Sequence, residues 1–296
     1  MISQGLPQAL ESGLRLHPRR SVIPAQVSPR NLGKPKSQTA KSSINGSVYS
    51  TSRPRAAPVF ASVSYAMKCY FGLVAEPRSY AEILQRGYVL NRDFRVAFGD
   101  SKIELCLLIA PHGGGIEPGS SEIMRTVAEM GGWAWYEFAG FLRKGNKDAL
   151  HISSTEFNEP TLKSMLPQTG FIVAFHGASE SREPIVYVGG KWSLGRRTVI
   201  EAINGAFRKH GIRAVDAIDN AAAAHLRGLD ESNITNLGKR AEGIQLEFSR
   251  GARNLLFPPD SSREARGHRS VKLRPLATSI HGGIKQLADN AIGRPA

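Results

Sequence analysis

The chain has 296 residues, enough for one large domain or two small ones with a sizeable hydrophobic core. Hydrophobic residues make up 41% and charged residues 22%, which is ordinary globular usage, and no apolar run approaches the roughly 18 residues of a membrane span. Cys69 and Cys106 are too few for a disulfide scaffold or a cysteine-ligated zinc ribbon. Composition thus excludes a membrane-spanning protein and favours a reducing compartment.

The net charge of +14 is unevenly distributed along the chain. Residues 1–66 contain nine Lys or Arg and one acidic residue, residues 67–257 contain 23 and 21, and residues 258–296 contain seven and three. A nucleic-acid-binding domain usually concentrates positive charge on its folded part. Because the middle segment is almost neutral, direct nucleic-acid binding is disfavoured. It is kept as an alternative in which the basic flanks bind nucleic acid or a partner protein.

The first 66 residues are rich in Ser, Pro and Arg and show no sustained helical or strand period. This composition predicts a disordered basic leader. It also resembles an organelle transit peptide, but it contains no apolar core of the kind that a secretory signal needs. A further interpretation is that translation begins at Met67, directly before the strand-like segment Cys69–Ala75.

From residue 67 onward, strand-like and helix-like segments alternate, which predicts an α/β domain over 67–296 with a mixed open sheet flanked by helices. Predicted strands, in chain order, are Leu105–Ala110, Trp133–Phe138, Ala149–Ile152, Phe171–Phe175, Ile185–Val188 and Ile244–Phe248. Predicted helices are Glu122–Met130, with Ser120 and Ser121 as possible caps, then Leu194–His210, ending at Gly211, and Ile280–Ile292. A basic loop is expected from about residue 258, after Pro258 and Pro259.

A histidine and a carboxylate, His112 and Glu117, follow the first buried strand at the end where α/β folds usually bind ligands. Three glycines between them let the chain fold back, so that both side chains can meet one ion. Zinc accepts both ligand types and needs a third from the protein. His176, directly after Phe171–Phe175, is the best third ligand.

Each of these residues alone has an ordinary structural explanation. A glycine run after a strand can be a tight turn, and a single histidine is more often a hydrogen-bonded structural residue than a ligand. Two histidines and one glutamate, all at strand ends in one region, favour a site for one Zn²⁺ ion.

The segment Ile244–Phe248 places Glu247 opposite an apolar face. Strand alternation puts Ile244, Leu246 and Phe248 on one side, and Gln245 with Glu247 on the other. Glu247 is therefore a candidate general base beside a metal-activated water. The alternative is an ordinary exposed glutamate on an edge strand.

Four further residues are candidate substrate contacts. Arg143 lies in a loop between two predicted strands, where it can bind a carbonyl oxygen or a substrate carboxylate or be a solvated charge. His151 shares a predicted strand face with Ser153 and either lines the cleft or has a structural role. Asn233 and Asn236 precede Gly238 and either bind a substrate carboxylate or shape the turn.

Several sequence motifs occur together and in order. They are APHGGGIEPGSSEI (Ala110–Ile123), LHISSTEFNEP (Leu150–Pro160), AFHG around His176, YVGG (Tyr187–Gly190) and GIQLEFSRGAR (Gly243–Arg253). Over about residues 68–257 the chain resembles the poly-γ-glutamate hydrolase family of phages and bacteria, which looks like a compact relative of the zinc carboxypeptidases. The resemblance implies a zinc-carboxypeptidase-like fold, with His112, Glu117 and His176 as zinc ligands and Glu247 as the catalytic carboxylate.

The resemblance also implies an activity, namely zinc-dependent hydrolysis of γ-glutamyl amide bonds in poly-γ-glutamate. The alternative substrate is a small acylated amino acid such as N-formylglutamate. We expect a monomer in the cytoplasm that reaches the polymer after cell lysis. The five-residue step from His112 to Glu117 exceeds the three-residue step of the large carboxypeptidases, so only the chemistry carries over. Residues 1–66 match no part of the family pattern.

Overall fold

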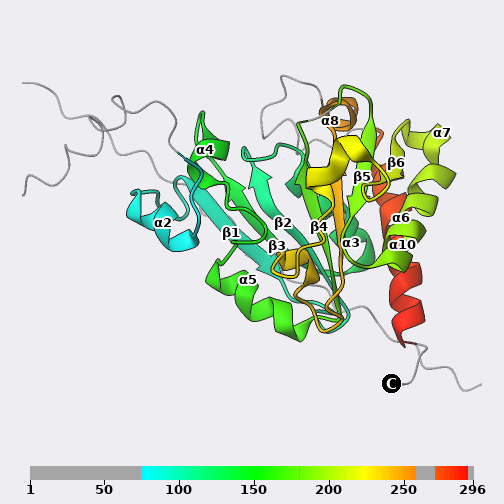
Figure 1. The fold of residues 1–296 in the computed structure, drawn as a ribbon, viewed down its shortest axis with the longest axis horizontal. Helices are drawn as coiled ribbons and strands as arrows, with labels where there is room; N and C mark the ends of the chain where they lie inside the picture. The colour runs from blue at the N-terminus through cyan, green and yellow to red at the C-terminus, as the bar shows by residue number, and fades with distance from the viewer. Residues whose placement is uncertain (1–74, 180, 258–270, 293–296) are drawn as a thin grey trace, which may run out of the picture. The chain divides into compact units, whose positions relative to one another are not determined.

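A seven-stranded mixed sheet organises the computed structural model, which describes residues 75–179, 181–257 and 271–292 (Figure 1). Its strand order is β1-β3-β2-β4-β7-β5-β6. The strands β3, β2, β4 and β7 run parallel to one another, while β1 pairs antiparallel with β3 and β5 pairs antiparallel with β7. The bounds are β1 Phe94–Gly99, β2 Cys106–Gly114, β3 Ala134–Gly140, β4 Phe171–Gly177, β5 Ile185–Gly189, β6 Arg213–Asp216 and β7 Ile244–Phe248.

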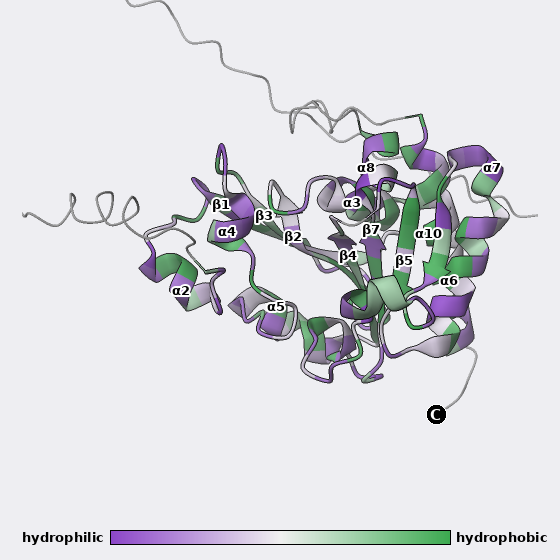
Figure 2. Ribbon diagram, turned by 45° about the horizontal axis from the view of Figure 1, so that its top comes forward, coloured by the Kyte–Doolittle hydropathy of each residue, from purple (hydrophilic) through white to green (hydrophobic). Residues whose placement is uncertain are grey.

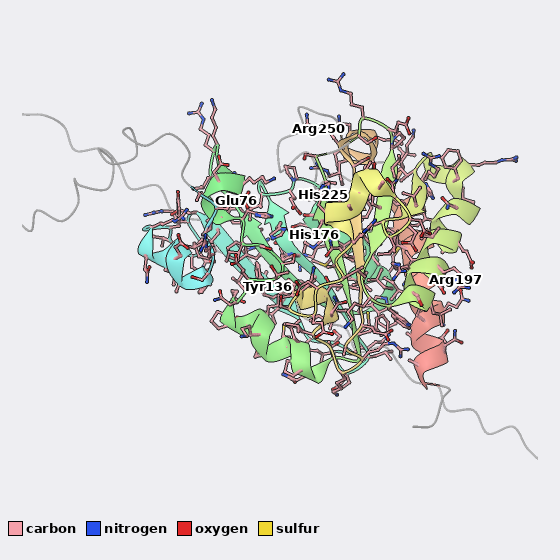
Figure 3. All side chains as sticks on the ribbon, viewed as in Figure 1. Glu76, Tyr136, His176, Arg197, His225 and Arg250 are labelled. Carbon is pink, nitrogen blue, oxygen red and sulfur yellow. The ribbon has the colours of Figure 1, made fainter. Side chains whose placement is uncertain are left out.

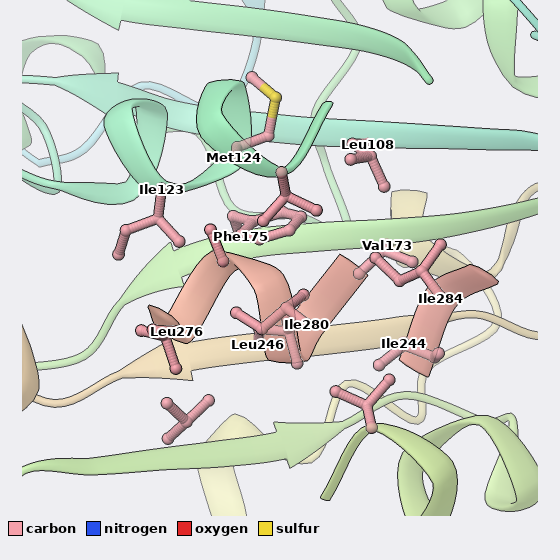
Figure 4. Close-up of a cluster of buried hydrophobic side chains, with 14 of the residues drawn as sticks. Leu108, Ile123, Met124, Val173, Phe175, Ile244, Leu246, Leu276, Ile280 and Ile284 are labelled. Atoms are coloured by element: carbon pink, nitrogen blue, oxygen red, sulfur yellow. The ribbon is translucent and has the colours of Figure 1, made fainter. Parts of the chain in front are cut away.

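Long helices cover one face of this sheet. They are α3 (Ser120–Gly131), α6 (Ser193–Gly205) and α10 (Leu273–Ile292). Figure 4 shows Leu276, Ile280 and Ile284 of α10 packed over β4 and β7. These side chains recur every three to four residues, which places them on one side of the helix. In Figure 2, which is coloured by hydropathy, the strands are largely apolar and the helices that cover them are of mixed polarity. This helix-covered face contains the largest apolar cluster among the described residues.

Short elements cover the opposite face. They include α2 (Tyr80–Gln85), α4 (Asn146–Leu150), α5 (Pro160–Met165) and the 3₁₀ turns η1 (Leu166–Gln168), η2 (Ala221–Leu226) and η3 (Ile234–Asn236). A second apolar cluster lies here, in which Leu107 and Ile109 of β2 meet Leu162 of α5. Because Cys106 and Leu108 face the helices instead, β2 alternates between two buried layers.

Five of the six predicted strands are confirmed, and β7 is an interior strand rather than an edge. The predicted strand Ala149–Ile152 is wrong, because residues 146–150 form α4. Its apolar residues Leu150 and Ile152 alternate as in a strand. However, Gly145, at φ +71°, turns the chain so that a helix begins at Asn146, before these residues. His151 and Ser153 therefore follow a helix and do not share a strand face.

Helix boundaries also differ from the expected ones. Gly119, at φ +102°, precedes α3, so Ser120 and Ser121 are helical residues and not caps. The predicted helix Leu194–His210 is broken at Ala206 into α6 and α7 (Phe207–His210), next to Gly205, a weak helix former. Gly211 ends α7 at φ +74°, as predicted. The last helix, α10, begins at Leu273, seven residues before the predicted start. The short helix α8 (Arg250–Leu256) was not predicted.

Some predictions concern residues outside the described ranges. These are the basic leader 1–66, the start at Met67, the strand Cys69–Ala75 apart from Ala75, and the basic loop after Pro258.

Cys106 is buried within β2, and this burial raises the pKa of its thiol well above the usual value. Among the helices of the described ranges, none combines the length and the apolar character needed to span a bilayer.

Candidate metal centre and active site

A β-bulge in β2 sets the direction of His112. The pairing of β2 with β3 steps from Ala110↔Glu137 to Gly113↔Ala139, so β2 contains one extra residue at this point. Simple alternation from Ala110 would direct His112 toward the helix-covered face. With the bulge, His112 instead lies beside Phe157 of the opposite apolar layer. The bulge thereby places the imidazole on the face covered by short elements.

The glycines after His112 allow the chain to fold back. Gly114 adopts φ +65°, and a Cβ there would lie 2.5 Å from the carbonyl oxygen of Gly140. The Glu117 amide then donates to the His112 carbonyl oxygen at 2.9 Å. Ser120 and Ser121 hold this loop, because Ser120 Oγ donates to the Glu117 carbonyl and Ser121 Oγ accepts from the Gly114 amide. Only glycine fits this close approach, which brings Glu117 back beside His112.

Three possible ligand atoms converge at the ends of β2 and β4. One atom each from His112, Glu117 and His176 lies within 4.8 Å of the other two. The Nδ1 atoms of the histidines are 3.1 Å apart, and Glu117 Oε1 is 3.1 Å from His112 Nδ1. His176, labelled in Figure 3, projects from the end of β4. The sequence prediction that these three residues lie together is thus met by their geometry.

Backbone groups orient two of these side chains. His112 Nε2 lies 2.7 Å from the Ile152 carbonyl oxygen and so donates to it, which directs Nδ1 toward Glu117 and His176. Glu117 Oε2 accepts from the Gly177 amide at 2.9 Å. Metal-binding histidines usually donate a hydrogen bond from their second ring nitrogen, as His112 does here. By contrast, His176 Nε2 is buried without a hydrogen-bond partner among the described residues. Two imidazoles and one carboxylate, facing one another with these constraints, fit a zinc ion.

Charge at the cluster agrees with a cation site. Burial alone would raise the pKa of Glu117, but the charges and hydrogen bonds of His112 and His176 hold it well below its usual value. Burial lowers the pKa of His176, whereas the charge of Glu247 and the contacts with Glu117 raise it, and the net direction is upward. The nearby carboxylates therefore favour positive charge at this point, from either protons or a metal.

Glu247 enters the same cavity from β7. It pairs with His176 across the parallel β4–β7 ladder, and its side chain lies opposite the apolar face formed by Ile244, Leu246 and Phe248. Gln245 Nε2 donates to Glu247 Oε1 at 2.9 Å.

Asn233 supports this carboxylate indirectly. Its Nδ2 donates to Gln245 Oε1 at 3.2 Å, and its Oδ1 accepts from the Thr235 amide at 2.9 Å. Asn233 also lines the cavity. Its clearest contact is thus with the residue that orients Glu247. Sequence reasoning placed Gln245 on the right face of β7 but gave it no role.

The cavity above the cluster has a volume of about 350 Å³ and is bordered by His151 and His225 as well as by the three candidate ligands and Glu247. The His151 ring lies on that of His112, with centroids 4.0 Å apart. His151 Nδ1 is 2.6 Å from Glu76 Oε2, and its Nε2 is 3.8 Å from Glu117 Oε1. Burial, together with the charge of His112, lowers the pKa of His151 to about 3. A neutral His151 that donates to Glu76 directs an acceptor nitrogen toward the cavity.

The other two predicted contacts lie elsewhere. Asn236 is buried and bonded to backbone groups, donating to the carbonyls of Gly228 and Asp230 and accepting from the amides of Lys191 and Gly243. Its geometry corresponds to the turn-shaping alternative. Arg143 is exposed and borders a different cavity, beside the loop that contains Glu117.

Arg253 of α8 joins the loops of the cluster, and sequence reasoning missed it. Its guanidinium donates to the carbonyl oxygens of Pro118, Ala178 and Phe248 at 3.0, 2.8 and 3.2 Å. Each acceptor residue is next to, or two residues from, one of Glu117, His176 and Glu247. The motif GIQLEFSRGAR contains Arg253, but the sequence has no signal that links it to carbonyls of distant segments.

Comparisons with known proteins agree with this arrangement. A family model described as poly-gamma-glutamate hydrolase matches residues 78–279. The UPF0714 protein YmaC of Bacillus subtilis (strain 168) is 30% identical over 195 residues, covering 66% of this chain and 78% of YmaC. A solved bacteriophage poly-gamma-glutamate hydrolase superposes with a TM-score of 0.65 at 27% identity, covering 73% of this chain and 99% of that one.

A second solved structure, YNDL in a zinc-free apo form, has a TM-score of 0.62 at 27% identity and covers 71% of this chain and 98% of its own. The family model extends past the motifs into α10, so it includes the sheet, the cluster and most of the helix-covered face. The resemblance that the motifs indicated is confirmed: the chain belongs to the poly-gamma-glutamate hydrolase family and is a hydrolase.

Proposed function

We propose that this hydrolase cleaves γ-glutamyl amide bonds of poly-γ-glutamate, with one zinc ion held by His112, Glu117 and His176. The observation that carries the proposal is the convergence of two imidazole nitrogens and a carboxylate beside a cavity that Glu247 also lines. The donor set suits zinc, and a solved relative at 27% identity is described as a zinc-free form.

Bound zinc would supply Lewis acidity, which makes a water molecule more acidic and polarises the scissile carbonyl. Glu247 has the position of the general base. Its carboxylate, oriented by the hydrogen bond from Gln245, would accept a proton from the attacking water. Glu247 then returns that proton to the leaving nitrogen, which an amide requires because an amide anion is a poor leaving group.

The test is hydrolysis of poly-γ-glutamate by the full chain, followed by the size distribution of the polymer. We expect shortening that a chelator abolishes and that added zinc restores. Glu247→Gln should keep stoichiometric zinc but lower the rate by about 10²- to 10⁴-fold, the usual contribution of a general base. Glu201→Gln, on the exposed side of α6, is the matched control and should retain full activity. Full activity of Glu247→Gln, or shortening that is indifferent to zinc, would contradict the proposal.

Chain length separates the polymer from a small acylated amino acid as substrate. A polymer hydrolase gains binding energy from residues beyond the scissile bond, so kcat/KM should rise with oligomer length. Efficient cleavage of N-formylglutamate, with no gain on longer γ-glutamyl chains, would favour the small-molecule alternative.

A further inference from the structure

A second cavity lies beside the candidate metal centre. It has a volume of about 590 Å³ and is formed by Gly115, Pro118 and residues 140–147. Gly115 and Pro118 flank the segment that contains Glu117, so one loop borders both cavities. Lys147 also lines both. The two cavities are therefore neighbours that share a wall and a lysine.

Positive charge distinguishes the second cavity. Arg143, Lys144 and Lys147 line it, all three are exposed, and none of its lining residues is acidic. The first cavity, by contrast, is lined by Glu117, Asp230 and Glu247. The second cavity therefore attracts anionic groups.

The loop that presents these cations is held in place. Asn146 Oδ1 accepts from the Leu142 amide at 2.9 Å, and its Nδ2 donates to the Leu142 carbonyl at 2.7 Å. The Phe141 amide donates to the Asp93 carbonyl at 2.7 Å. Asn146 is buried and packs so closely on Gly140 that a Cβ there would lie 2.6 Å from its Oδ1. Because hydrogen bonds already hold the backbone of this loop, binding an anion there does not require the loop to become ordered.

We propose that the second cavity is a distal subsite that binds α-carboxylates of a poly-γ-glutamate chain whose scissile bond lies at the metal centre. This inference rests on the proposed function. In a γ-linked polymer each residue retains a free α-carboxylate, so a bound chain presents anions at a distance from the bond that is cut. Lys147 lies between the two cavities and continues the positive surface from one to the other.

The test compares the double variant Arg143→Gln/Lys144→Gln with the control Arg197→Gln/Arg208→Gln. Arg197 and Arg208 are also exposed, on α6 and α7, and Figure 3 shows Arg197 on the side of the molecule away from His176. The first measurement is binding of labelled poly-γ-glutamate to full chains that also contain Glu247→Gln, which prevents turnover. We expect the subsite variant to raise Kd about fivefold, because exposed ion pairs are individually weak, and the control to leave it unchanged.

The second measurement uses chains with Glu247 intact. In the subsite variant, the ratio of kcat/KM on long polymer to kcat/KM on the shortest cleaved oligomer should fall by a similar factor. Added salt should weaken polymer binding more in the wild type than in this variant. The exchange Arg143→Lys/Lys144→Arg keeps both charges and should bind polymer as tightly as the wild type. That result would assign the weaker binding of the Gln variant to its lost charges.

The proposal is overturned if the subsite variant binds polymer as the control does and keeps the wild-type chain-length ratio. It is also overturned if the charge-preserving exchange is as weak as the Gln pair. Failure of the proposed function has a different signature, in that wild-type protein with zinc leaves the polymer intact. The binding measurement still decides the subsite in that case, because it does not depend on turnover.

Discussion

The two faces of the sheet are built in different ways. On one face α3, α6 and α10 form a continuous apolar layer with β4, β7 and β5. On the other, short helices and turns surround a polar cavity in which hydrogen bonds to a backbone carbonyl and to Gln245 orient His112 and Glu247. The first face contributes most of the apolar burial, and the second contains the candidate metal centre. Changes to the two faces should therefore separate stability from activity.

Ile280→Ala in α10 disturbs the helix-covered face and should have the largest effect on stability. Ile280 is fully buried against β4 and β7, and truncation of such a side chain typically costs about 2–5 kcal/mol. The unfolding free energy in denaturant should fall by this amount, while kcat/KM of the folded protein stays at the wild-type value. Gln286→Ala, on the exposed side of the same helix, is the control and should change neither quantity. A large loss of kcat/KM in folded Ile280→Ala would show that the faces are not separable in this way.

Arg253→Met should instead weaken zinc binding at the candidate metal centre. The change removes three hydrogen bonds to the loops of the cluster but keeps an unbranched side chain. Since residues that orient ligands typically contribute 10- to 100-fold in metal affinity, we expect zinc binding to weaken by about that factor. Zinc titration against a competing chelator measures this. Arg250→Met, an exposed arginine in the same helix, serves as control. Equal zinc affinity in the two variants would remove Arg253 from the support of the site.

The smallest expected effect concerns His210, which is buried at the end of α7. Its Nδ1 accepts from the Ile212 amide at 3.1 Å and its Nε2 donates to the Ile203 carbonyl at 3.1 Å, an arrangement that requires the neutral ring. Burial lowers the pKa of His210 below its usual 6.5, although the bond to Ile203 opposes this. The unfolded chain therefore binds the proton more readily, and this contribution to stability is complete above pH 6.5 and lost as the pH falls below it.

His210→Gln removes the titrating ring and so tests that dependence. Its Tm should be lower than that of the wild type near neutral pH and should decline less on acidification, so the two Tm curves converge. Curves that stay parallel from neutral to acidic pH would show that His210 titrates alike in the folded and unfolded chains.

The sequence predicted the two faces unequally. Apolar runs such as Leu105–Ala110 and Phe171–Phe175 are buried on both sides, so their strands were identified, together with the positions of His112 and His176 at their ends. Helix α4 was misread because Leu150 and Ile152 alternate as strand residues do. The extra residue in β2 leaves no mark in the His112–Glu117 spacing, yet it decides which face the imidazole occupies.

Contacts between distant segments were beyond sequence reasoning. Asn233 reaches Glu247 through Gln245, and Arg253 reaches the carbonyls of Pro118 and Ala178, which lie 135 and 75 residues earlier in the chain. Arg143, predicted as a substrate contact, borders the cavity beside the metal centre. Residue type and strand position thus predicted the candidate ligands, while the supporting residues depended on tertiary hydrogen bonds.

Arg253 donates to three main-chain oxygens, at Pro118, Ala178 and Phe248. Carbonyl oxygens are present whatever side chain a residue has, so substitutions at these positions leave the acceptors in place. The rim of the active site can therefore diversify, by natural drift or by library selection, while the relative placement of the ligand-bearing loops is kept. In evolutionary terms, contacts of this kind make new substrate preferences accessible without rebuilding the candidate metal centre.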